Sequence, residues 1–273
     1  MLNMPPLNRF ADLVSNEHFD LTLASLMLAE DVQPDIDLSA HMAQIKAMAA
    51  TLRARVAEDA FAEQKLAALN YYLFEELGFR GNVENYYDPR NAYLHEVLTR
   101  RTGMPITLGI LYIELGRRVG LNLQGVAFPG HFLVSLRLRQ AKLLLDPFAA
   151  GATQTPAALR QRLKLPADAK LDAHLIEATP RHMLVRLLRN LKTMHLKADA
   201  PMLALAAMQR LLLLVPESAE ALRDRGLLYA QLDCFRPALS DLLNYLRRRP
   251  QAEDAGDIES RLTGLRKAVQ SLH

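Results

Sequence analysis

Several residues of the C-terminal third of the chain recur at one spacing, which constrains its fold more than any other feature of the sequence. The recurring pairs, each separated by 34 residues, are Leu188 and Leu222, Ala204 and Ala238, and Pro216 and Pro250. A period of this length is typical of stacked helical hairpins, in which small residues let two helices approach closely and a proline ends the second helix. The sequence therefore predicts a short helical solenoid in this part of the chain.

The later copy of the repeat holds small and aromatic residues in the relative places that a tetratricopeptide repeat uses, namely Gly226, Tyr229, Phe235, Ala238 and Pro250. The earlier copy has Lys192 and His195 where the glycine and the tyrosine would stand, so we expect no more than two units. The more polar segment 257–272 is predicted to form a last helix that caps the stack, as every solenoid end requires.

The hydrophobic period of the N-terminal part changes after Gly120. Before this residue, apolar side chains recur at spacings of three and four, which predicts amphipathic helices over 18–32, 36–56, 58–78 and 106–118. After it the period falls to two, which predicts short strands over 122–128, 131–139 and 142–148. The dipeptide Pro129-Gly130 and a turn around 139–141 separate these strands. Three antiparallel strands behind helices predict an α+β domain, followed by helical turns and a connector.

Length and composition set the organisation that we expect. The 273 residues suffice for two domains, which we place at 1–177, a helical segment with the α+β domain, and at 178–273, the helical repeats. The chain starts without an apolar run of signal-peptide length, and no later run approaches a membrane span. A single cysteine, Cys234, fits a reducing compartment. We therefore expect a cytoplasmic protein in which Cys234 is a packing residue between repeat helices.

The stretch FPGHFLVSLRLRQAKLLLDPF, residues 128–148, carries a candidate site. His131 begins one predicted strand and Asp146 ends the next, so an antiparallel hairpin brings the two side chains together. A histidine and an aspartate in this relation are two members of a catalytic triad. The third member is missing, because the only cysteine lies far away in the repeats.

The chain resembles the SirB family of bacterial proteins, whose members join an N-terminal transglutaminase-like domain to C-terminal tetratricopeptide-type helices. The resemblance rests on GNVENYYDPRNAYLHEVLTRRTGMPITLGILY, GVAFPGHFLVSL and LLLDPFAAG, together with the repeat, and covers nearly the whole chain. It implies an α+β, mostly helical fold: a transglutaminase-like (papain-like) core with a small antiparallel sheet, followed by an α-helical solenoid.

In the wider superfamily of transglutaminases and papain-like thiol enzymes, a cysteine opens a helix, a histidine starts a following strand and an aspartate ends the next. By motif, His131 and Asp146 match the histidine and the aspartate. The corresponding helix, PITLGILYIELG, contains no cysteine, and Thr107 is the hydroxyl nearest to the expected place. A thiol is ionised by a helix N-terminus and an imidazolium, whereas a threonine hydroxyl starts several pKa units higher and gains little from the same field.

Two interpretations of function follow. In the first, Thr107 caps its helix, the His131–Asp146 pair serves structure or ligand binding, and the protein is a non-catalytic regulatory protein that binds a protein or peptide partner. In the second, Thr107, His131 and Asp146 form a cysteine-independent amide hydrolase or transamidase. We favour the first interpretation. The identity of the partner cannot be read from the sequence.

Two further groups of residues are candidates for binding. The polar and aromatic loop before the motif helix contains Asn82, Asn85, Tyr86, Tyr87 and Asn91, which either line a cleft or only form turn hydrogen bonds. The segment 181–192 spaces Arg181, Arg186, Arg189 and Lys192 as a basic stripe, which we interpret as a solvated helix face rather than an RNA-binding surface. Scattered histidines and the absence of phosphate-loop or dinucleotide motifs predict neither a metal nor another cofactor.

Overall fold

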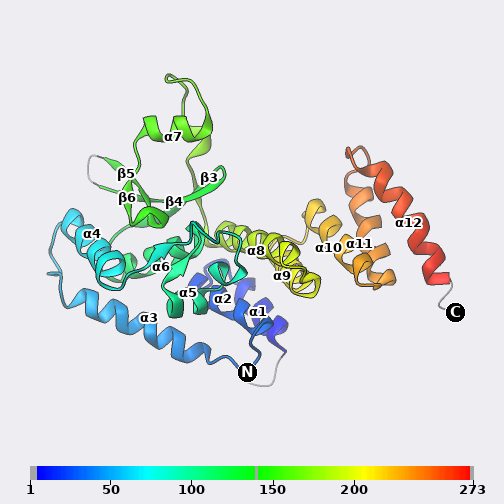
Figure 1. Ribbon diagram of the computed structural model, residues 1–273, viewed down its shortest axis with the longest axis horizontal. Helices are drawn as coiled ribbons and strands as arrows, with labels where there is room; N and C mark the ends of the chain where they lie inside the picture. Colours follow the sequence, from blue (N-terminus) through cyan, green and yellow to red (C-terminus); the bar gives the residue numbers. More distant parts are fainter. Residues whose placement is uncertain (1–4, 139–140, 271–273) are drawn as a thin grey trace. The chain divides into compact units, whose positions relative to one another are not determined.

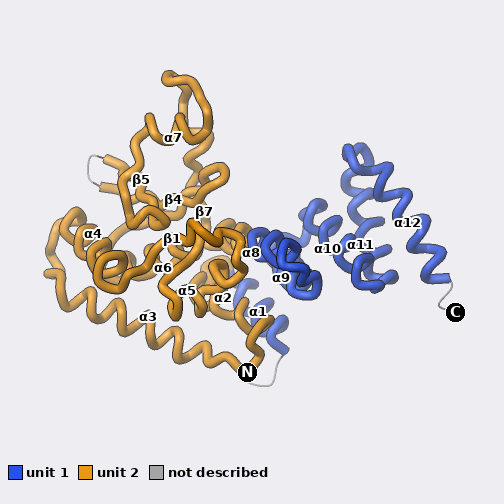
Figure 2. Tube along the Cα trace, viewed as in Figure 1, with its two compact units in different colours: residues 1–16, 188–273 blue, residues 17–187 orange. Residues whose placement is uncertain are grey.

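The computed structural model describes residues 5–138 and 141–270, and in it the change of period after Gly120 separates helices from a sheet (Figure 1). The chain forms two units, Glu17–Leu187 and a second one that joins Met1–Asn16 to Leu188–His273 (Figure 2). The predicted division into 1–177 and 178–273 stays a prediction, and α8 (Pro180–Lys197) itself continues from one unit into the other. The predicted turn at 139–141 and the end of the capping helix fall partly outside the described residues.

Helices make up most of the unit Glu17–Leu187, and local signals fix several of their ends. The Asp37 side chain caps α3 by accepting a hydrogen bond from the Ala40 backbone N–H at 3.0 Å. Gly78 and Gly120 adopt left-handed backbone conformations just past two other helical segments. The α-helices are α2 (Leu21–Met27), α3 (Leu38–Arg53), α4 (Ala62–Asn70), α5 (Leu94–Arg100), α6 (Pro105–Arg118) and α7 (Pro156–Leu163).

Short helical turns connect several of these elements. A π-helical turn, η2 (Tyr71–Glu76), continues α4, so the predicted helix over 58–78 is real but changes its winding. The remaining turns are 3₁₀ helices: η1 (Leu28–Asp31), η3 (Pro89–Ala92), η4 (Pro147–Ala149) and η5 (Asp172–His174).

The sheet of this unit is antiparallel and larger than predicted. Its strand order is β6–β5–β4–β3–β7, with the predicted strands as its centre. The strands are β3 (Leu123–Phe128), β4 (His131–Arg137), β5 (Lys142–Asp146), β6 (Ala152–Thr153) and β7 (Ile176–Ala178). A separate parallel pair joins β1 (Arg80–Gly81) to β2 (Thr102–Gly103). The predicted three-stranded core is confirmed, and the short edge strands were not predicted.

Both faces of the central strands are covered. On one face Phe132 packs against α6 at Gly109, where a side-chain carbon would lie 2.5 Å from the Phe132 ring. On the other face Leu133 shares an apolar cluster with Leu159 of α7. Because successive side chains of a strand point to opposite faces, β4 is buried along almost its whole length. This packing fixes the backbone position of His131, the first residue of β4.

The second unit consists of helices. After the shared α8, these are α9 (Pro201–Leu214), α10 (Ala219–Gln231), α11 (Phe235–Arg248) and α12 (Ala255–Gln270). They form the two predicted hairpins and the predicted last helix. Gly226 lets α10 and α11 approach closely, since a side-chain carbon there would lie 2.8 Å from Leu242 Cγ. Among the described residues, no helix is long and apolar enough to cross a membrane.

Two features of this unit differ from the predictions. An N-terminal helix, α1 (Pro6–Ser15), packs against α9, and there Arg210 stacks over the Phe10 ring at 4.9 Å, with both side chains fully buried. None of the predicted helices covers these residues. Cys234 is exposed at the start of α11, so its predicted role as a packing residue is wrong.

Candidate functional site

His131 and Asp146 form a buried pair at the end of the central hairpin. The Nε2–H group of His131 donates a hydrogen bond to Asp146 Oδ2 at 2.8 Å. The two residues are only 5% and 3% exposed. They meet because β4 pairs with β3 through the tight turn Pro129-Gly130 on one side and with β5 on the other. The hairpin register thus brings the two predicted triad members together.

The loop after β5 surrounds this pair. The Phe148 backbone N–H donates to Asp146 Oδ1 at 3.0 Å, so Asp146 also caps η4. The Phe148 ring stands edge-on to the His131 ring at 6.0 Å and covers Gly81, where a side-chain carbon would lie 2.5 Å from that ring. Arg162 Nη1 lies 3.7 Å from Asp146 Oδ2, a distance that gives attraction without a direct hydrogen bond. Asp146 therefore has both oxygens engaged.

Thr107 lies elsewhere, at the start of α6, and is completely buried. Its hydroxyl lies 2.7 Å from the Asn91 carbonyl oxygen and 3.1 Å from the Met104 carbonyl oxygen, and it accepts a hydrogen bond from the Met104 N–H at 3.2 Å. Among the described residues, no hydrogen bond joins Thr107 to His131. The structure thus brings two of the three predicted triad residues together and leaves the third in a different network.

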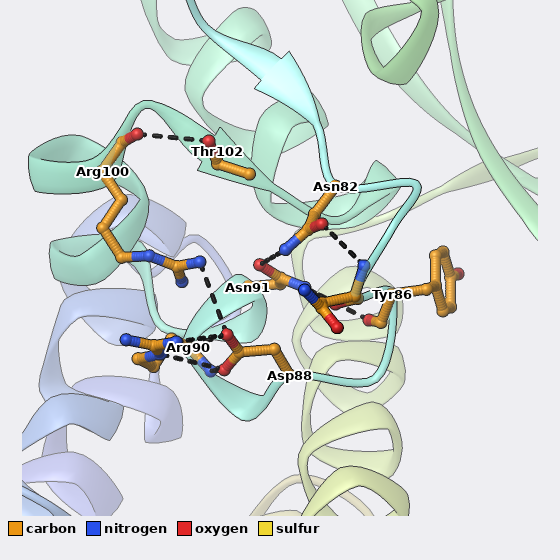
Figure 3. Close-up of polar contacts among 8 residues, drawn as sticks. Asn82, Tyr86, Asp88, Arg90, Asn91, Arg100 and Thr102 are labelled. Atoms are coloured by element: carbon orange, nitrogen blue, oxygen red, sulfur yellow. Dashed lines mark hydrogen bonds and ion pairs between the residues drawn. The ribbon is translucent and has the colours of Figure 1, made fainter.

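The loop residues Asn82 and Asn91 (Figure 3), together with Asn85, belong to the network that Thr107 joins. The Asn91 amide donates to the Asn85 and Tyr86 carbonyl oxygens at 2.8 and 3.2 Å, and its own oxygen accepts from the Asn82 amide at 3.0 Å. The Asn85 N–H donates to Asn82 Oδ1 at 2.9 Å. Asn91 is completely buried, and its side-chain amide stabilises the loop conformation through these hydrogen bonds. Of the predicted binding residues, the asparagines take part in turn-forming hydrogen bonds.

The two tyrosines of the loop have different surroundings. The Tyr86 ring is half-buried and stands 6.1 Å from the Phe148 ring, at 70° to it. Tyr87 is 52% exposed and meets Tyr86 edge-on at 5.3 Å. Burial raises the pKa of the Tyr86 phenol, while Arg186 and Arg162 act in the opposite direction. Tyr86 is therefore the one predicted loop residue whose ring extends to the environment of the His131–Asp146 pair.

Asp88, at the end of the same loop, stabilises it through contacts with two arginines (Figure 3). Its carboxylate caps η3 through the Arg90 N–H at 3.0 Å and pairs with the Arg90 guanidinium at 2.8 Å. Arg100 approaches the same carboxylate at 3.4 Å. Burial raises the pKa of the Asp88 carboxyl, but the hydrogen bonds and charge of Arg90 outweigh this effect and hold it below its usual value.

Two residues next to the pair, Phe148 and Arg162, were not predicted as site residues, and Arg186 was predicted only as part of a solvated stripe. Arg186 of α8 is half-buried, and its Nη1 donates to the Phe128 carbonyl oxygen at 3.1 Å. The predicted solvated basic stripe is thus wrong for Arg186. It is also wrong for Lys192, which pairs with Asp224 at 2.6 Å. Spacing along a helix shows which side chains share a face but not what covers that face.

Metal binding finds no support in the described ranges 5–138 and 141–270, where no three His, Cys, Asp or Glu side chains gather in a group that could hold an ion. The described residues of the site supply a buried imidazole–carboxylate pair, a tyrosine and two guanidinium groups.

Comparison with known proteins identifies relatives of both parts of the chain. The model of the transglutaminase-like superfamily matches residues 39–189, and that of the tetratricopeptide repeat matches residues 191–263. A UPF0162 protein of Xylella fastidiosa is 40% identical over 270 residues, which cover 97% of this chain and 96% of that protein. Protein SirB1 of Salmonella typhimurium is 31% identical over 192 residues, which cover 69% and 70%. F-box only protein 21 of Mus musculus is 49% identical over 71 residues, 26% of this chain and 11% of that protein.

Proposed function

This chain belongs to the transglutaminase-like superfamily and to the SirB/UPF0162 family of bacterial proteins, and on that premise we propose that it is a non-catalytic protein-interaction protein with a regulatory role. The observation that carries the proposal is the state of the Thr107 hydroxyl. That group is the hydroxyl nearest to the expected place of the superfamily's thiol, and it is completely buried and hydrogen-bonded to backbone groups.

A threonine nucleophile needs its proton removed by a hydrogen-bonded base during attack. The Thr107 proton has backbone carbonyl acceptors at 2.7 and 3.1 Å, and its lone pair accepts from the Met104 N–H. No part of the residue is exposed to a substrate. These contacts support a structural role in which the hydroxyl ties the loop at Asn91 to the start of α6.

The His131–Asp146 pair supports the same proposal. A buried imidazole needs a hydrogen-bond partner whether or not a nucleophile is present, and Asp146 supplies one. Asp146 in turn caps η4, which gives the carboxylate a structural use of its own. The pair therefore persists on physical grounds that do not require catalysis.

The helical hairpins supply a surface for a partner. A shallow hollow of about 140 Å³ lies between α8 and α10, and it is lined by Lys192, Leu196, Asp224, Leu227, Leu228 and Gln231. Leu196 is 42% exposed beside the Lys192–Asp224 ion pair, so apolar and charged groups are presented together. Stacked hairpins use such surfaces to bind peptides or helices of other proteins.

Replacing Thr107 with valine tests the non-catalytic half of the proposal. We expect the free energy of unfolding to fall by about 1–2 kcal/mol, because the one hydrogen bond that the buried hydroxyl donates and the one that it accepts are both lost. The matched control is Thr99→Val, since the exposed Thr99 hydroxyl donates only to the His95 carbonyl oxygen of its own helix, at 3.0 Å. This control is expected to cost less than about 1 kcal/mol. Urea denaturation measures both values.

The same proteins are assayed for ammonia release and for amine incorporation with a glutamine-containing peptide. We expect wild type and both variants to show the rate of the buffer alone. Turnover by wild type that disappears in Thr107→Val but persists in Thr99→Val would establish the hydrolase or transamidase instead.

Replacing Leu196 with aspartate tests the binding half. A charge at the centre of an apolar contact should reduce capture of the partner from native cell extract by roughly tenfold or more. Leu213→Asp is the matched control, because Leu213 is similarly exposed, at 39%, but lies on α9, whose residues do not line the hollow. Equal capture by wild type and Leu196→Asp would exclude this surface.

A further inference from the structure

Arg186 is a half-buried cation, and no acidic side chain in the described part of the chain forms an ion pair with it. Its only hydrogen bond to another described residue goes to the Phe128 carbonyl oxygen, and no carboxylate of the residues in 5–138 and 141–270 forms an ion pair with it. Burial lowers the pKa of its guanidinium, with the Tyr86 phenol acting in the opposite direction. Charged groups taken out of water are normally paired, because desolvation is otherwise uncompensated. The remaining donors of this guanidinium are thus available to an external acceptor.

This guanidinium lies at the His131 end of the sheet. Phe128, which accepts its hydrogen bond, is the cross-strand partner of His131. Arg162 reaches the same place from α7, with Nη1 3.7 Å from Asp146 Oδ2 and 44% of its side chain exposed. Tyr86 reaches it from the loop through its ring contact with Phe148, which itself contacts His131. The charges of Arg186 and Arg162 both act on the Tyr86 phenol, so these three groups from three separate elements lie near one another at this end of the sheet.

We propose that Arg186, Arg162 and Tyr86 form a site for a carboxylate group on an acidic peptide segment of a partner protein. This inference rests on the proposed function and specifies the chemistry of the partner. A guanidinium presents a planar array of N–H donors that matches a carboxylate, and a tyrosine hydroxyl adds one more donor. Hydrogen bonds between charged groups are about twice as strong as neutral ones, so such a site gives both affinity and orientation.

The charge around the site favours a carboxylate over a phosphate. Asp146 already attracts Arg162, which leaves the two arginines with little more than one uncompensated positive charge. A singly charged carboxylate balances this excess, whereas a phosphate with close to two negative charges would be repelled by Asp146. Nucleic acid is disfavoured as a ligand, since Lys192 is paired with Asp224 and does not extend the basic surface along α8.

The test uses the full-length protein and fluorescence anisotropy of fluorescein-labelled hexaglutamate. Arg186→Met keeps the length of the side chain and removes its charge, and we expect it to weaken binding roughly tenfold to a hundredfold. Arg189→Met is the matched control, because Arg189 is exposed on the same helix three residues away. It should bind as wild type does. Labelled hexaglutamine should show no binding to any of the three proteins.

Thermal unfolding separates this loss from misfolding. Since the unpaired charge of Arg186 stabilises nothing in the free protein beyond one hydrogen bond, Arg186→Met should have an unchanged or higher Tm. Hexaglutamate should raise the Tm of wild type and leave that of Arg186→Met unchanged. Arg162→Gln provides a second variant and should weaken binding in the same assay.

Undiminished binding by Arg186→Met, or equal losses in Arg186→Met and Arg189→Met, would overturn the site. A competition measurement adds a third such result, in which inorganic phosphate displaces labelled hexaglutamate from wild type as effectively as free glutamate does. None of these results bears on the hollow at Leu196, so weaker capture by Leu196→Asp would leave the proposed function standing without this site. Amide turnover that depends on Thr107 would remove the proposed function whatever hexaglutamate does.

Discussion

Replacing Asp146 with alanine is expected to lower the free energy of unfolding by about 3 kcal/mol or more. The change leaves the His131 imidazole without its hydrogen-bond partner in a place that is 5% exposed. It also removes the acceptor of the Phe148 N–H, so the η4 turn loses its cap. Breaking a buried pair by removing one partner is costly because the other partner stays desolvated and unpaired.

A double-mutant cycle with His131→Ala measures how much of this cost belongs to the pair. If the bond is structural, the double variant should be more stable than the sum of the single variants predicts, by about 1.5 kcal/mol or more. Asp146→Asn is the conservative control, since its amide oxygen still accepts from the Phe148 N–H while its NH2 group donates to Nε2 of the other neutral imidazole tautomer. We expect it to cost about 1 kcal/mol. Urea denaturation gives all four values.

A coupling energy near zero would contradict this account. It would mean that His131 and Asp146 do not stabilise each other and that their proximity requires another explanation, such as catalysis. An Asp146→Ala protein as stable as wild type would lead to the same conclusion. The experiment therefore tests the structural role of the pair independently of any assay of activity.

Local signals explain why much of the fold could be predicted. The 34-residue spacing of Pro216 and Pro250 identified both hairpins, because each hairpin is one structural unit and its length sets the period of the sequence. Asp37 as a helix cap and Gly120 as a helix end follow from the hydrogen-bonding needs of one turn of backbone. The proximity of His131 and Asp146 could be predicted, because a hairpin pairs strands that are adjacent in sequence.

The remaining features depend on contacts between distant segments. Strand β7 has three residues and pairs with β3 about fifty positions earlier, so no alternation identifies it. The contact of Arg186 with the Phe128 carbonyl oxygen could not be predicted, because helical spacing indicates only which face of the helix a residue lies on. The position of the Phe148 ring beside the pair could not be predicted, because it depends on the space that a distant glycine, Gly81, leaves for the ring. Sequence thus identified the residues of local turns and missed those that other elements bring to the site.

Gly151 closes the loop that carries Asp146 and Phe148. Its N–H donates to the Asp146 carbonyl oxygen at 2.9 Å, and its φ of +74° lies in the left-handed region that disfavours side chains. A side-chain carbon at this position would lie 2.8 Å from Asn70 Cγ and closer still to the amide oxygen. That oxygen accepts the Tyr112 hydroxyl at 2.6 Å, so the glycine seats the site loop against a buried hydrogen bond.

Gly151→Ala is therefore expected to cost about 3 kcal/mol. Roughly 1 kcal/mol comes from the left-handed backbone, and about 2 kcal/mol comes from displacing Asn70 and breaking its bond to Tyr112. Gly130→Ala isolates the first contribution, because Gly130 has a φ of +68° and nothing within 4 Å of the added carbon. Denaturation in urea should separate the two variants by about 2 kcal/mol. Equal costs would show that Asn70 moves aside freely and that the site loop does not depend on its fit against Asn70.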